Sequence, residues 1–260
     1  MTVARYLFSR SEKKILEQFA KRRTLIAFDF DGTLSRIEKK PDQVTVDPAV
    51  AALLKRLEEL TPVAVVSGRN RGNLARVLSS RPDYLIGNHG LESPGASPAL
   101  VKRAASTCRS WMRQLVPVVK GLPGVELEDK RYSLSIHYRR SPKSRLRAKF
   151  EILAVCEKLQ PRPHLILGKA VVNVIPQGSP GKGKALLALM RKEGFTHAIY
   201  IGDDDTDEDV FTLKEARSAK PRILGIRVGR RAESSARYFI LRQSQINRVL
   251  SELVRLSHQR

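Results

Sequence analysis

Residues 24–34 read TLIAFDFDGTL, an apolar run that ends in acid, glycine and threonine. This pattern is typical of a buried strand that runs out into a loop at the edge of a sheet. Side chains two apart on an extended chain face the same way, so Asp29 and Asp31 can enter one site while Phe30 turns away. Two carboxylates this close at a buried strand end need a cation or a shared proton, unless they form a capped turn in solvent.

Segments on either side of this strand alternate between helix and strand. A helix is predicted from Pro48 to Leu60, with Asp47 as its N-cap and Pro48 at its first position. The other predicted elements of this kind are strands at 62–66, 84–86, 197–201, 223–228 and 238–241, and helices at 73–79, at 183–193 and at the C-terminus to about Leu256. Unbroken apolar strands interleaved with helices indicate a parallel sheet covered on both faces, with ligands bound at the carboxyl ends of its strands.

The pattern changes between about Leu91 and Gln177. The predicted elements there are helices at 99–119 and 144–159 and strands at 125–130, 132–139, 164–167 and 170–175. Sequential strand pairs with alternating polarity favour an antiparallel α+β unit with one exposed sheet face. We therefore expect a core domain of residues 1–91 and 178–260, interrupted by a second domain of residues 92–177.

A second acidic cluster follows the predicted strand at 197–201, where residues 202–209 read GDDDTDED. Asp203 and Asp204 stand at the carboxyl end of that strand, at the sheet edge where Asp29 is expected. The later acids, Asp207 to Asp209, fit a solvated loop or the start of a helix. Carboxylates from two strand ends of one parallel sheet make an oxygen-rich site of the kind that Mg²⁺ prefers.

Two further residues suit a phosphoryl group. Ser67 ends the predicted strand at 62–66 and can reach the same edge, although Ser-Gly-Arg alone also fits a turn. Residues 178–185 read GSPGKGKA and match the GxxxxGK pattern of a nucleotide-binding loop, but Ala185 lacks the hydroxyl that such a loop requires. The preferred interpretation is that Lys182, at the start of a helix, binds a phosphoryl group together with backbone N–H groups.

Taken in order, these residues carry a family resemblance. Asp29-x-Asp31, Ser67, Lys182 and the cluster at 202–207 resemble the four motifs of the haloacid dehalogenase superfamily of phosphohydrolases. Residues 202–211, the sequence GNHGLE at 87–92 and the sequence EDKRYSLSIHYR at 128–139 are similar to trehalose-6-phosphate phosphatases of that superfamily. The resemblance covers about Leu25 to Phe211. It implies an α/β fold, with a Rossmann-like core built on a parallel sheet and an inserted α+β cap of the C2 type.

The resemblance also implies a two-step displacement. Asp29 would attack phosphorus and form an aspartyl-phosphate, while Asp31 would act as acid and then as base. Ser67 and Lys182 would hold the phosphoryl oxygens. The implied cofactor is Mg²⁺, with these ligands: Asp29, the backbone carbonyl of Asp31, and Asp203, supported by Asp204.

For the sugar, the resemblance implies contacts from the cap. Glu128 and Lys130 would bind glucosyl hydroxyls, and on a strand they share a face, although an exposed Glu and Lys on an open sheet face is the plainer interpretation. The other candidate substrate contacts are Asn88, His89, His137, Arg139 and Asn173. Asn173 departs from the family, which usually has a glutamate before the proline of this strand, so the identity of the sugar stays open.

Composition sets the remaining expectations. The chain has 260 residues, 48 Lys plus Arg against 26 Asp plus Glu, a net charge of +22 and 42% hydrophobic residues. Such basicity raises the hypothesis of nucleic-acid binding, but aromatics make up only 6% and no RRM, KH or helix-turn-helix signature is present. The chain has two cysteines and no run of about 18 uncharged apolar residues, so we expect a cytoplasmic monomer without a membrane segment.

The leading hypothesis is a Mg²⁺-dependent phosphatase that converts trehalose 6-phosphate to trehalose and phosphate. One alternative is the same chemistry on another sugar phosphate, such as a glucosyl- or mannosyl-glycerate phosphate. Another is a basic nucleic-acid-binding protein on a degenerate phosphatase scaffold. Residues 101–170 alone hold 16 Lys plus Arg against 5 acids. A single anionic substrate does not account for so much charge.

Overall fold

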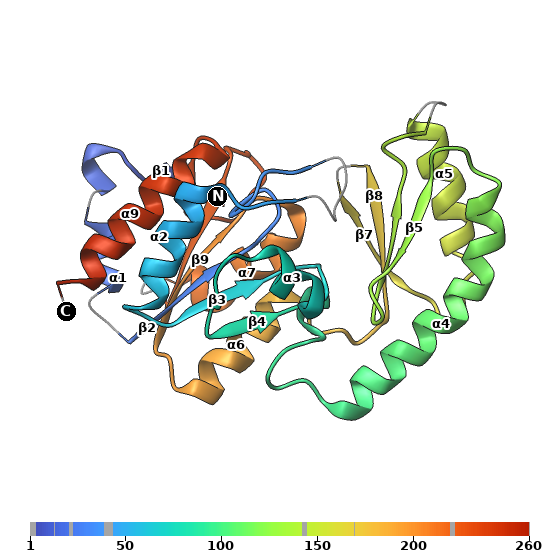
Figure 1. The fold of residues 1–260 in the computed structure, drawn as a ribbon, viewed down its shortest axis with the longest axis horizontal. Coiled ribbons are helices and arrows are strands. Elements are labelled where there is room, and N and C mark those ends of the chain that lie inside the picture. Colours follow the sequence, from blue (N-terminus) through green and yellow to red (C-terminus); the bar gives the residue numbers. More distant parts are fainter. Residues whose placement is uncertain are drawn as a thin grey trace. The chain divides into compact units, whose positions relative to one another are not determined.

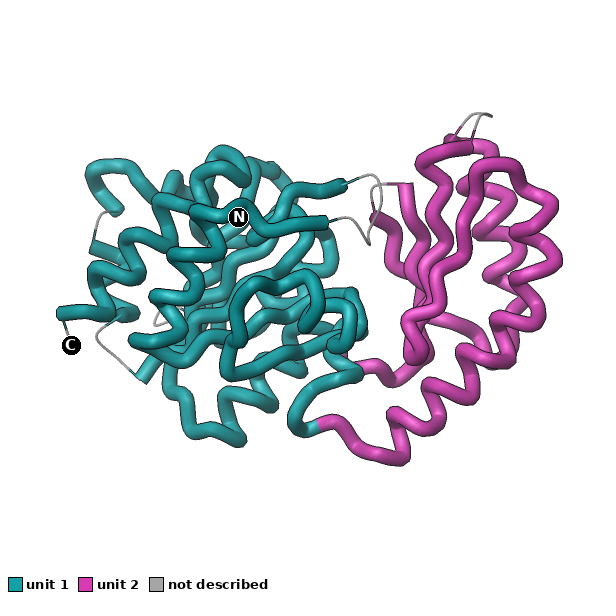
Figure 2. The backbone as a smooth tube through the Cα atoms, in the orientation of Figure 1, with its two compact units in different colours: residues 1–95, 181–260 teal, residues 96–180 magenta. Residues whose placement is uncertain are grey.

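The computed structural model describes residues 4–12, 14–20, 23–38, 44–141, 145–168, 170–218 and 222–259. Two compact units divide the chain, Met1–Gly95 with Gly181–Arg260, and Ala96–Pro180 (Figure 2). The second unit thus interrupts the first in sequence, close to the predicted boundaries at 91/92 and 177/178.

The first unit is built on a sheet whose described strands all pair in parallel, in the order β1-β11-β10-β9-β2-β3-β4 (Figure 1). Their bounds are β1 Arg5–Tyr6, β2 Thr24–Phe28, β3 Val63–Val66, β4 Tyr84–Ile86, β9 His197–Gly202, β10 Ile223–Val228 and β11 Tyr238–Ile240. The apolar run of the opening segment is β2, which is buried throughout and lies between β9 and β3. This confirms the predicted parallel sheet and puts β2 and β9 side by side.

Helices cover both faces of this sheet. They are α1 Ile15–Ala20, α2 Pro48–Glu58, α3 Arg71–Val77, α6 Gly181–Glu193, α7 Glu208–Phe211, α8 Lys214–Arg217 and α9 Ile246–Ser257. Side chains of α1, α2 and α9 share one apolar cluster with Ile26 and Phe28, whereas α6 and α7 share another with Leu25 and Ala27. The alternate residues of β2 therefore enter two separate cores, as expected of a strand buried on both faces.

The second unit is a four-stranded antiparallel sheet among the described residues, in the order β5-β6-β8-β7. Its elements are α4 Pro98–Lys120, β5 Glu126–Asp129, β6 Leu134–His137, α5 Arg145–Cys156, β7 His164–Gly168 and β8 Val171–Ile175. Both helices pack on one sheet face, where Trp111, Ile152 and Val172 belong to a single apolar cluster. By alternation, the opposite face carries Ser135 and Asn173.

A few elements differ from the predictions. β1 and α1 were not predicted, because β1 pairs with β11 over only two residues and α1 is a single short amphipathic stretch. β5 and β6 are shorter than the predicted strands at 125–130 and 132–139. The reason is a turn in which Arg131 has φ +73° and its N–H donates to Asp129 Oδ1 at 2.7 Å. No helix in the described part of the chain is both long and apolar enough to cross a membrane.

Candidate active site

The two carboxylate motifs meet at the carboxyl edge of the parallel sheet. Asp29 follows β2, and its N–H donates at 2.8 Å to the carbonyl of Ile201 on the neighbouring β9, two residues before Asp203. Gly32 has φ +86°, and a Cβ at this position would overlap the Asp203 carboxylate. Only glycine therefore allows the loop after β2 to lie against the loop after β9.

Lys182 joins both motifs from the N-terminal turn of α6. Its Nζ donates to Asp29 Oδ1 and to Asp207 Oδ1, each at 2.7 Å, and all three side chains are buried. Tyr200 O–H also donates to Asp207 Oδ1, at 2.6 Å. Lys182 stands at a helix start between two glycines, as the sequence predicted. It is not part of a nucleotide-binding loop, because the preceding strand β8 belongs to the antiparallel sheet.

Burial and charge perturb the ionisable groups of this cluster. Burial raises the pKa of Asp29 well above its ordinary value; Lys182 opposes this, whereas Asp207 and Asp203 add to it. Burial also lowers the pKa of Lys182, but Asp207 and Asp29 outweigh it and raise the pKa overall, so Lys182 stays an ammonium. Burial is the main reason why the pKa of Tyr200 is raised, which keeps its hydroxyl a donor. One ammonium thus faces several carboxylates in a buried place, an excess of negative charge that a cation would relieve.

The residues fit a hard divalent cation. Asp29, Asp203 and Asp207 each offer an oxygen, and these oxygens lie within 4.8 Å of one another. All are carboxylate donors, the ligands that Mg²⁺ favours, and the glycine at position 32 leaves the Asp203 carboxylate room beside them.

Asp204 caps the turn that follows β9, and Asp207 lies in the carboxylate cluster. Asp204 Oδ1 accepts from Asp205 N–H at 2.7 Å, and Asp207 Oδ2 accepts from Asp204 N–H at 2.9 Å, which makes a capping box at the turn 205–207. Of the two expectations for Asp207, the start of a helix is confirmed, since Asp207 is the N-cap of α7, and the solvated loop was wrong, since its side chain is fully buried and lies in the carboxylate cluster. The sequence signal was available in its spacing, since a residue three after the N-cap folds back onto it.

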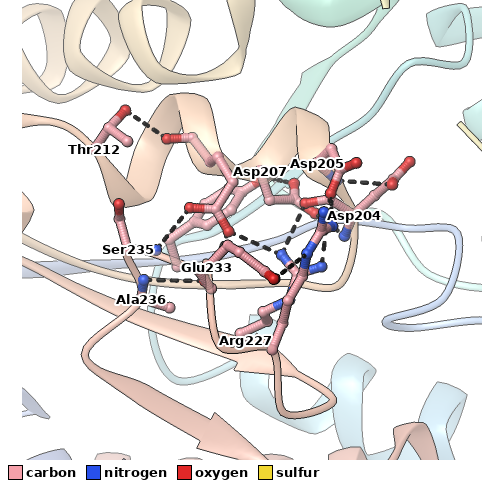
Figure 3. Close-up of polar contacts among 12 residues, drawn as sticks. Asp204, Asp205, Asp207, Thr212, Arg227, Glu233, Ser235 and Ala236 are labelled. Atoms are coloured by element: carbon pink, nitrogen blue, oxygen red, sulfur yellow. Dashed lines mark hydrogen bonds and ion pairs between the residues drawn. The ribbon is translucent and has the colours of Figure 1, made fainter. Parts of the chain in front are cut away.

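The turn of the second motif is anchored from β10 and the loop that follows it (Figure 3). Arg227 Nη1 donates to the Asp204 carbonyl at 3.1 Å and to Glu208 Oε1 at 3.0 Å. Arg231 contacts Asp205, and the Ser235 N–H donates to Glu208 Oε2 at 2.9 Å. The acids Asp205 and Glu208 therefore fix the turn, while Asp203 and Asp207 belong to the cluster.

Asp31 lies beside the loop after β3. Arg69 Nε donates to Asp31 Oδ2 at 2.6 Å and Arg69 Nη2 to Asp31 Oδ1 at 2.7 Å, a two-pronged ion pair that the sequence did not reveal. Phe30 is buried in the apolar cluster on the other side, as the alternation predicted. Ser67 is buried, and its Oγ accepts from Arg69 N–H at 3.1 Å, so the loop brings the predicted serine near the acid motif.

Asn88 and His89 belong to a tight turn of the first unit. Both have positive φ, and both are buried. Asn88 N–H donates to the Arg69 carbonyl at 2.7 Å, and Asn88 Nδ2 donates to Glu92 Oε2 at 2.7 Å. The His89 ring lies where a Cβ on Gly68 would stand. The GNHGLE segment therefore packs on the loop of Ser67.

The remaining candidates gather on the second unit, on the sheet face opposite its helices. Glu128 Oε2 and His137 Nε2 lie 2.9 Å apart, and Lys130 Nζ lies 3.8 Å from the same oxygen. Asn173 Oδ1 accepts from Ser135 Oγ at 2.6 Å. Arg139 follows the end of β6 in a turn. These polar groups line up as a platform on one face of β5, β6 and β8, as the i, i+2 rule predicted for Glu128 and Lys130.

Comparisons with known proteins give a consistent picture. A family model described as trehalose-phosphatase matches residues 27–244. The probable trehalose-phosphate phosphatase 4 of Oryza sativa subsp. japonica is 29% identical over 246 residues, which is 90% of this chain and 66% of that protein. The trehalose-phosphate phosphatase of Mycobacterium tuberculosis strain H37Rv is 31% identical over 213 residues, which is 74% of this chain and 51% of that protein. The chain thus spans about two thirds of the length of the plant relatives and about half of the mycobacterial one.

Solved structures share the fold. A trehalose-6-phosphate phosphatase related protein superposes with a TM-score of 0.75 at 22% identity, covering 90% of this chain and 99% of that one. The C-terminal domain of the Candida albicans trehalose-6-phosphate phosphatase gives 0.74 at 20% identity, covering 97% of this chain and 98% of that one.

Proposed function

The chain belongs to the trehalose-phosphatase family, a group of phosphoric monoester hydrolases within the haloacid dehalogenase superfamily. On that premise we propose that it hydrolyses trehalose 6-phosphate to trehalose and phosphate with the help of Mg²⁺. One observation carries this proposal: Asp29 Oδ1 lies 2.7 Å from Lys182 Nζ, in a cluster with oxygens of Asp203 and Asp207. A nucleophilic carboxylate, an ammonium and a hard-cation site at one place are what phosphoryl transfer through an aspartyl-phosphate needs.

In the first step, an oxygen of Asp29 attacks phosphorus. The bond between phosphorus and the sugar oxygen breaks, its electron pair goes to that oxygen, and Asp31 supplies the proton. Trehalose leaves, and Asp29 carries the phosphoryl group. A poor leaving group such as a sugar alkoxide needs this proton, which is why a second acid two residues from the nucleophile is useful.

In the second step, Asp31 takes a proton from water while the water oxygen attacks phosphorus. The bond from phosphorus to the Asp29 oxygen breaks, and phosphate departs with Asp29 restored as a carboxylate. Asp31 is then protonated again and ready for the next ester. Both steps therefore depend on where the Asp31 carboxylate is held.

Lys182 and Ser67 would position the phosphoryl oxygens. The ammonium of Lys182 has three N–H donors, and two hydrogen bonds to Asp29 and Asp207 leave one for a phosphoryl oxygen. The Ser67 hydroxyl accepts from Arg69 N–H and retains its own O–H to donate. Ser67 follows β3 and Lys182 lies in the first turn of α6, so the two groups would bind the phosphoryl group from different elements of the first unit.

Asp29 and Asp203 would hold Mg²⁺, with the Asp31 carbonyl as a further ligand and Asp207 as an additional carboxylate. The cation would supply positive charge that offsets the negative charge of the phosphoryl group and the carboxylates. On the second unit, we propose that Glu128, Lys130 and His137 bind sugar hydroxyls, supported by their grouping on one sheet face.

A second candidate is the same hydrolysis on a glucosyl- or mannosyl-glycerate phosphate. Asn173 favours it, because its amide oxygen accepts from Ser135 at 2.6 Å where the family usually has a glutamate. A neutral amide held in this way selects a different pattern of hydroxyls from a carboxylate.

A panel of sugar phosphates, assayed for released phosphate with purified full-length chain and Mg²⁺, tests both candidates. We expect the highest kcat/KM on trehalose 6-phosphate, no hydrolysis after chelation with EDTA, and none for Asp29→Asn. Asp47→Asn, a change at an exposed helix cap of the same unit, is the matched control and should retain activity. A preference for a glycerate-linked sugar phosphate would establish the second candidate, and no hydrolysis of any sugar phosphate would refute both.

A further inference from the structure

Helix α5 of the second unit exposes two large apolar side chains. Leu146 is 62% and Phe150 is 63% exposed, the highest fractions among the large hydrophobic residues that the structure describes. Four residues apart on a helix, they lie on the same face, away from the buried Ala148 and Ile152. The sheet core of this unit does not use them, and nothing in the proposed hydrolysis requires them.

The two helices of this unit are rich in cations. α5 itself carries Arg145, Arg147 and Lys149 against one acid, Glu151, which is paired with Arg147 at 3.1 Å. α4 lies on the same sheet face and has no acid at all. Its basic residues are Lys102, Arg103, Arg109, Arg113 and Lys120. The acids of this unit are otherwise on β5 and just after α5, so the two helices carry 8 of its 16 Lys and Arg but only one of its 5 acids.

We propose that this helical layer binds an anionic lipid surface, with Leu146 and Phe150 inserted among the headgroups and the arginines and lysines on lipid phosphates. Two modest signals, apolar insertion and a basic cluster, together give stable membrane attachment where either alone does not. Near an anionic leaflet each Lys or Arg strengthens binding by about fivefold. Nucleic acid would use the cations but would leave the exposed Leu146 without a role, because stacking on bases requires aromatic rings.

Co-sedimentation of the full-length chain with vesicles tests this surface. We expect binding to phosphatidylcholine vesicles that contain phosphatidylglycerol, and little to pure phosphatidylcholine. Leu146→Ser with Phe150→Ser should weaken binding by about tenfold or more. The triple variant Arg145→Gln, Arg147→Gln, Lys149→Gln should weaken it by about 100-fold. Leu241→Ser, an equally exposed leucine of the first unit at 56%, is the matched control and should bind as the wild type does. Hydrolysis of a soluble phosphate ester should be unchanged in all these variants.

Several results would overturn the proposal. One is that the chain binds neither kind of vesicle. Another is equal weakening by the α5 double variant and by Leu241→Ser. A third is a change of oligomeric state in the α5 double variant by light scattering, which would mean that a second copy covers this face. A fourth is binding to a DNA duplex that survives the double variant while no vesicle is bound.

A separate observation concerns Arg69, and it rests on the proposed function. Its guanidinium makes the two-pronged pair with Asp31 at 2.6 and 2.7 Å, donates from Nη1 to Asn73 Oδ1 at 2.8 Å, and lies over the Phe30 ring with Cζ 5.3 Å from the centroid. The Arg69 side chain is only 8% exposed, whereas that of Asp31 is 38% exposed. The partly exposed Asp31 carboxylate is thus held by the buried guanidinium of Arg69.

We infer that Arg69 is a positioning residue that holds the Asp31 carboxylate where it exchanges a proton with the leaving oxygen and with water. Two parallel hydrogen bonds restrict the rotation of the carboxylate in a way that one cannot. Lysine offers a point charge rather than a planar fork, so Arg69→Lys should not replace the arginine. Small misplacements of a reacting group cost about 100-fold in rate.

First-turnover kinetics with two leaving groups test this role. For Arg69→Lys and Arg69→Gln we expect the first turnover of a sugar phosphate to slow by about 100-fold. The first release of p-nitrophenolate from p-nitrophenyl phosphate, which needs no proton, should change by less than about threefold. Arg71→Gln, an exposed arginine two residues on, should match the wild type for both esters.

Equal losses on both esters would show that Arg69 only supports the fold or the phosphoryl group, and would overturn the inference. So would unchanged rates. If the wild type hydrolyses p-nitrophenyl phosphate but no sugar phosphate, the proposed substrate is wrong and the role of Arg69 in sugar release falls with it. A wild type inactive on every ester would refute the phosphatase activity itself.

Discussion

At the scale of single residues, Asp207 decides how the buried ammonium of Lys182 is held. Asp207→Asn removes one of its two charged partners at 2.7 Å, and we expect the free energy of unfolding to fall by about 3 kcal/mol. Phosphate release should fall by about 100-fold, because Lys182 and the cation site both lose a carboxylate. Urea unfolding and a phosphate assay measure the two effects.

Asp205→Asn is the matched control for this change. Asp205 belongs to the same turn, but its carboxylate is 47% exposed and its contact with Arg231 lies at the surface. The expected loss of stability is below about 1 kcal/mol. Equal losses in the two variants would contradict the special role of the buried acid.

The thiols of Cys108 and Cys156 are expected to react slowly because both are buried. Burial raises the pKa of Cys108 and of Cys156 to about 12. A raised pKa favours the folded protein below the pKa of an unfolded thiol, and this contribution is lost as the pH rises toward 12. We expect iodoacetamide at pH 8 to label neither thiol in the native chain and both in guanidinium, as measured by intact mass. Rapid native labelling at either position would contradict this burial.

The sequence predicted the residues of the site better than their partners. The shared location of Asp29, Asp31, Ser67 and Asp203 follows from strand ends, because the carboxyl ends of parallel strands meet at one edge. The position of Lys182 follows from a glycine-flanked lysine at a helix start. Arg69 and Asp207 were not foreseen in their roles. Arg69 contacts Asp31 across 38 residues and Asp207 contacts Lys182 across 25, and only the folded loops bring these pairs together.

At the scale of elements, α6 and α7 lie so close that one glycine keeps them in place. A Cβ at Gly183 would overlap the Asp209 backbone carbonyl, which cannot move as a side chain can. Gly183→Ala should therefore cost about 1–3 kcal/mol of stability and displace Lys182, lowering activity more than stability alone explains. Thermal unfolding measures the loss of stability, and kcat measures the loss of activity.

Gly72→Ala in α3 serves as the comparison for this helix glycine. Its Cβ would meet only the Asn70 side chain at an ordinary 3.5 Å, and helix propensity favours alanine. We expect a gain of about 0.5–1 kcal/mol with activity retained. If Gly72→Ala destabilised the chain as much as Gly183→Ala does, the close approach of α6 and α7 would not be the cause.

Local chemistry explains which elements the sequence predicts well. α2 begins at Pro48 as expected, because Asp47 Oδ1 accepts from Ala49 N–H at 2.9 Å. β10 spans Ile223–Val228, the predicted bounds, because every residue in it is buried. α6 begins at Gly181 rather than 183, and the apolar pattern does not show this because residues 181–184 read GKGK and the first apolar side chain is Ala185. Edge pairings such as β1 with β11 leave no comparable signal.

At the scale of the whole molecule, each unit has its own apolar core, and this should separate their unfolding. Trp111, the single tryptophan of the chain, is fully buried in the core of the second unit. Mg²⁺ with orthovanadate, a phosphate mimic that binds the first unit, should raise the midpoint seen by circular dichroism by several degrees. The tryptophan fluorescence transition should stay where it was. A joint shift of both transitions would mean that the chain unfolds as one cooperative body.

The pairing of β2 with β9 also sets an order of events during synthesis. Asp29 and Lys182 are 153 residues apart in the chain, and the whole of the second unit is made between them. On the ribosome, β2 lacks its neighbour until β9 emerges. The strands of the second unit are complete before that, because β8 ends at Ile175 and β9 begins at His197. The inserted unit can therefore fold first, and the site that joins the two carboxylate motifs forms only after Asp207 has left the exit tunnel.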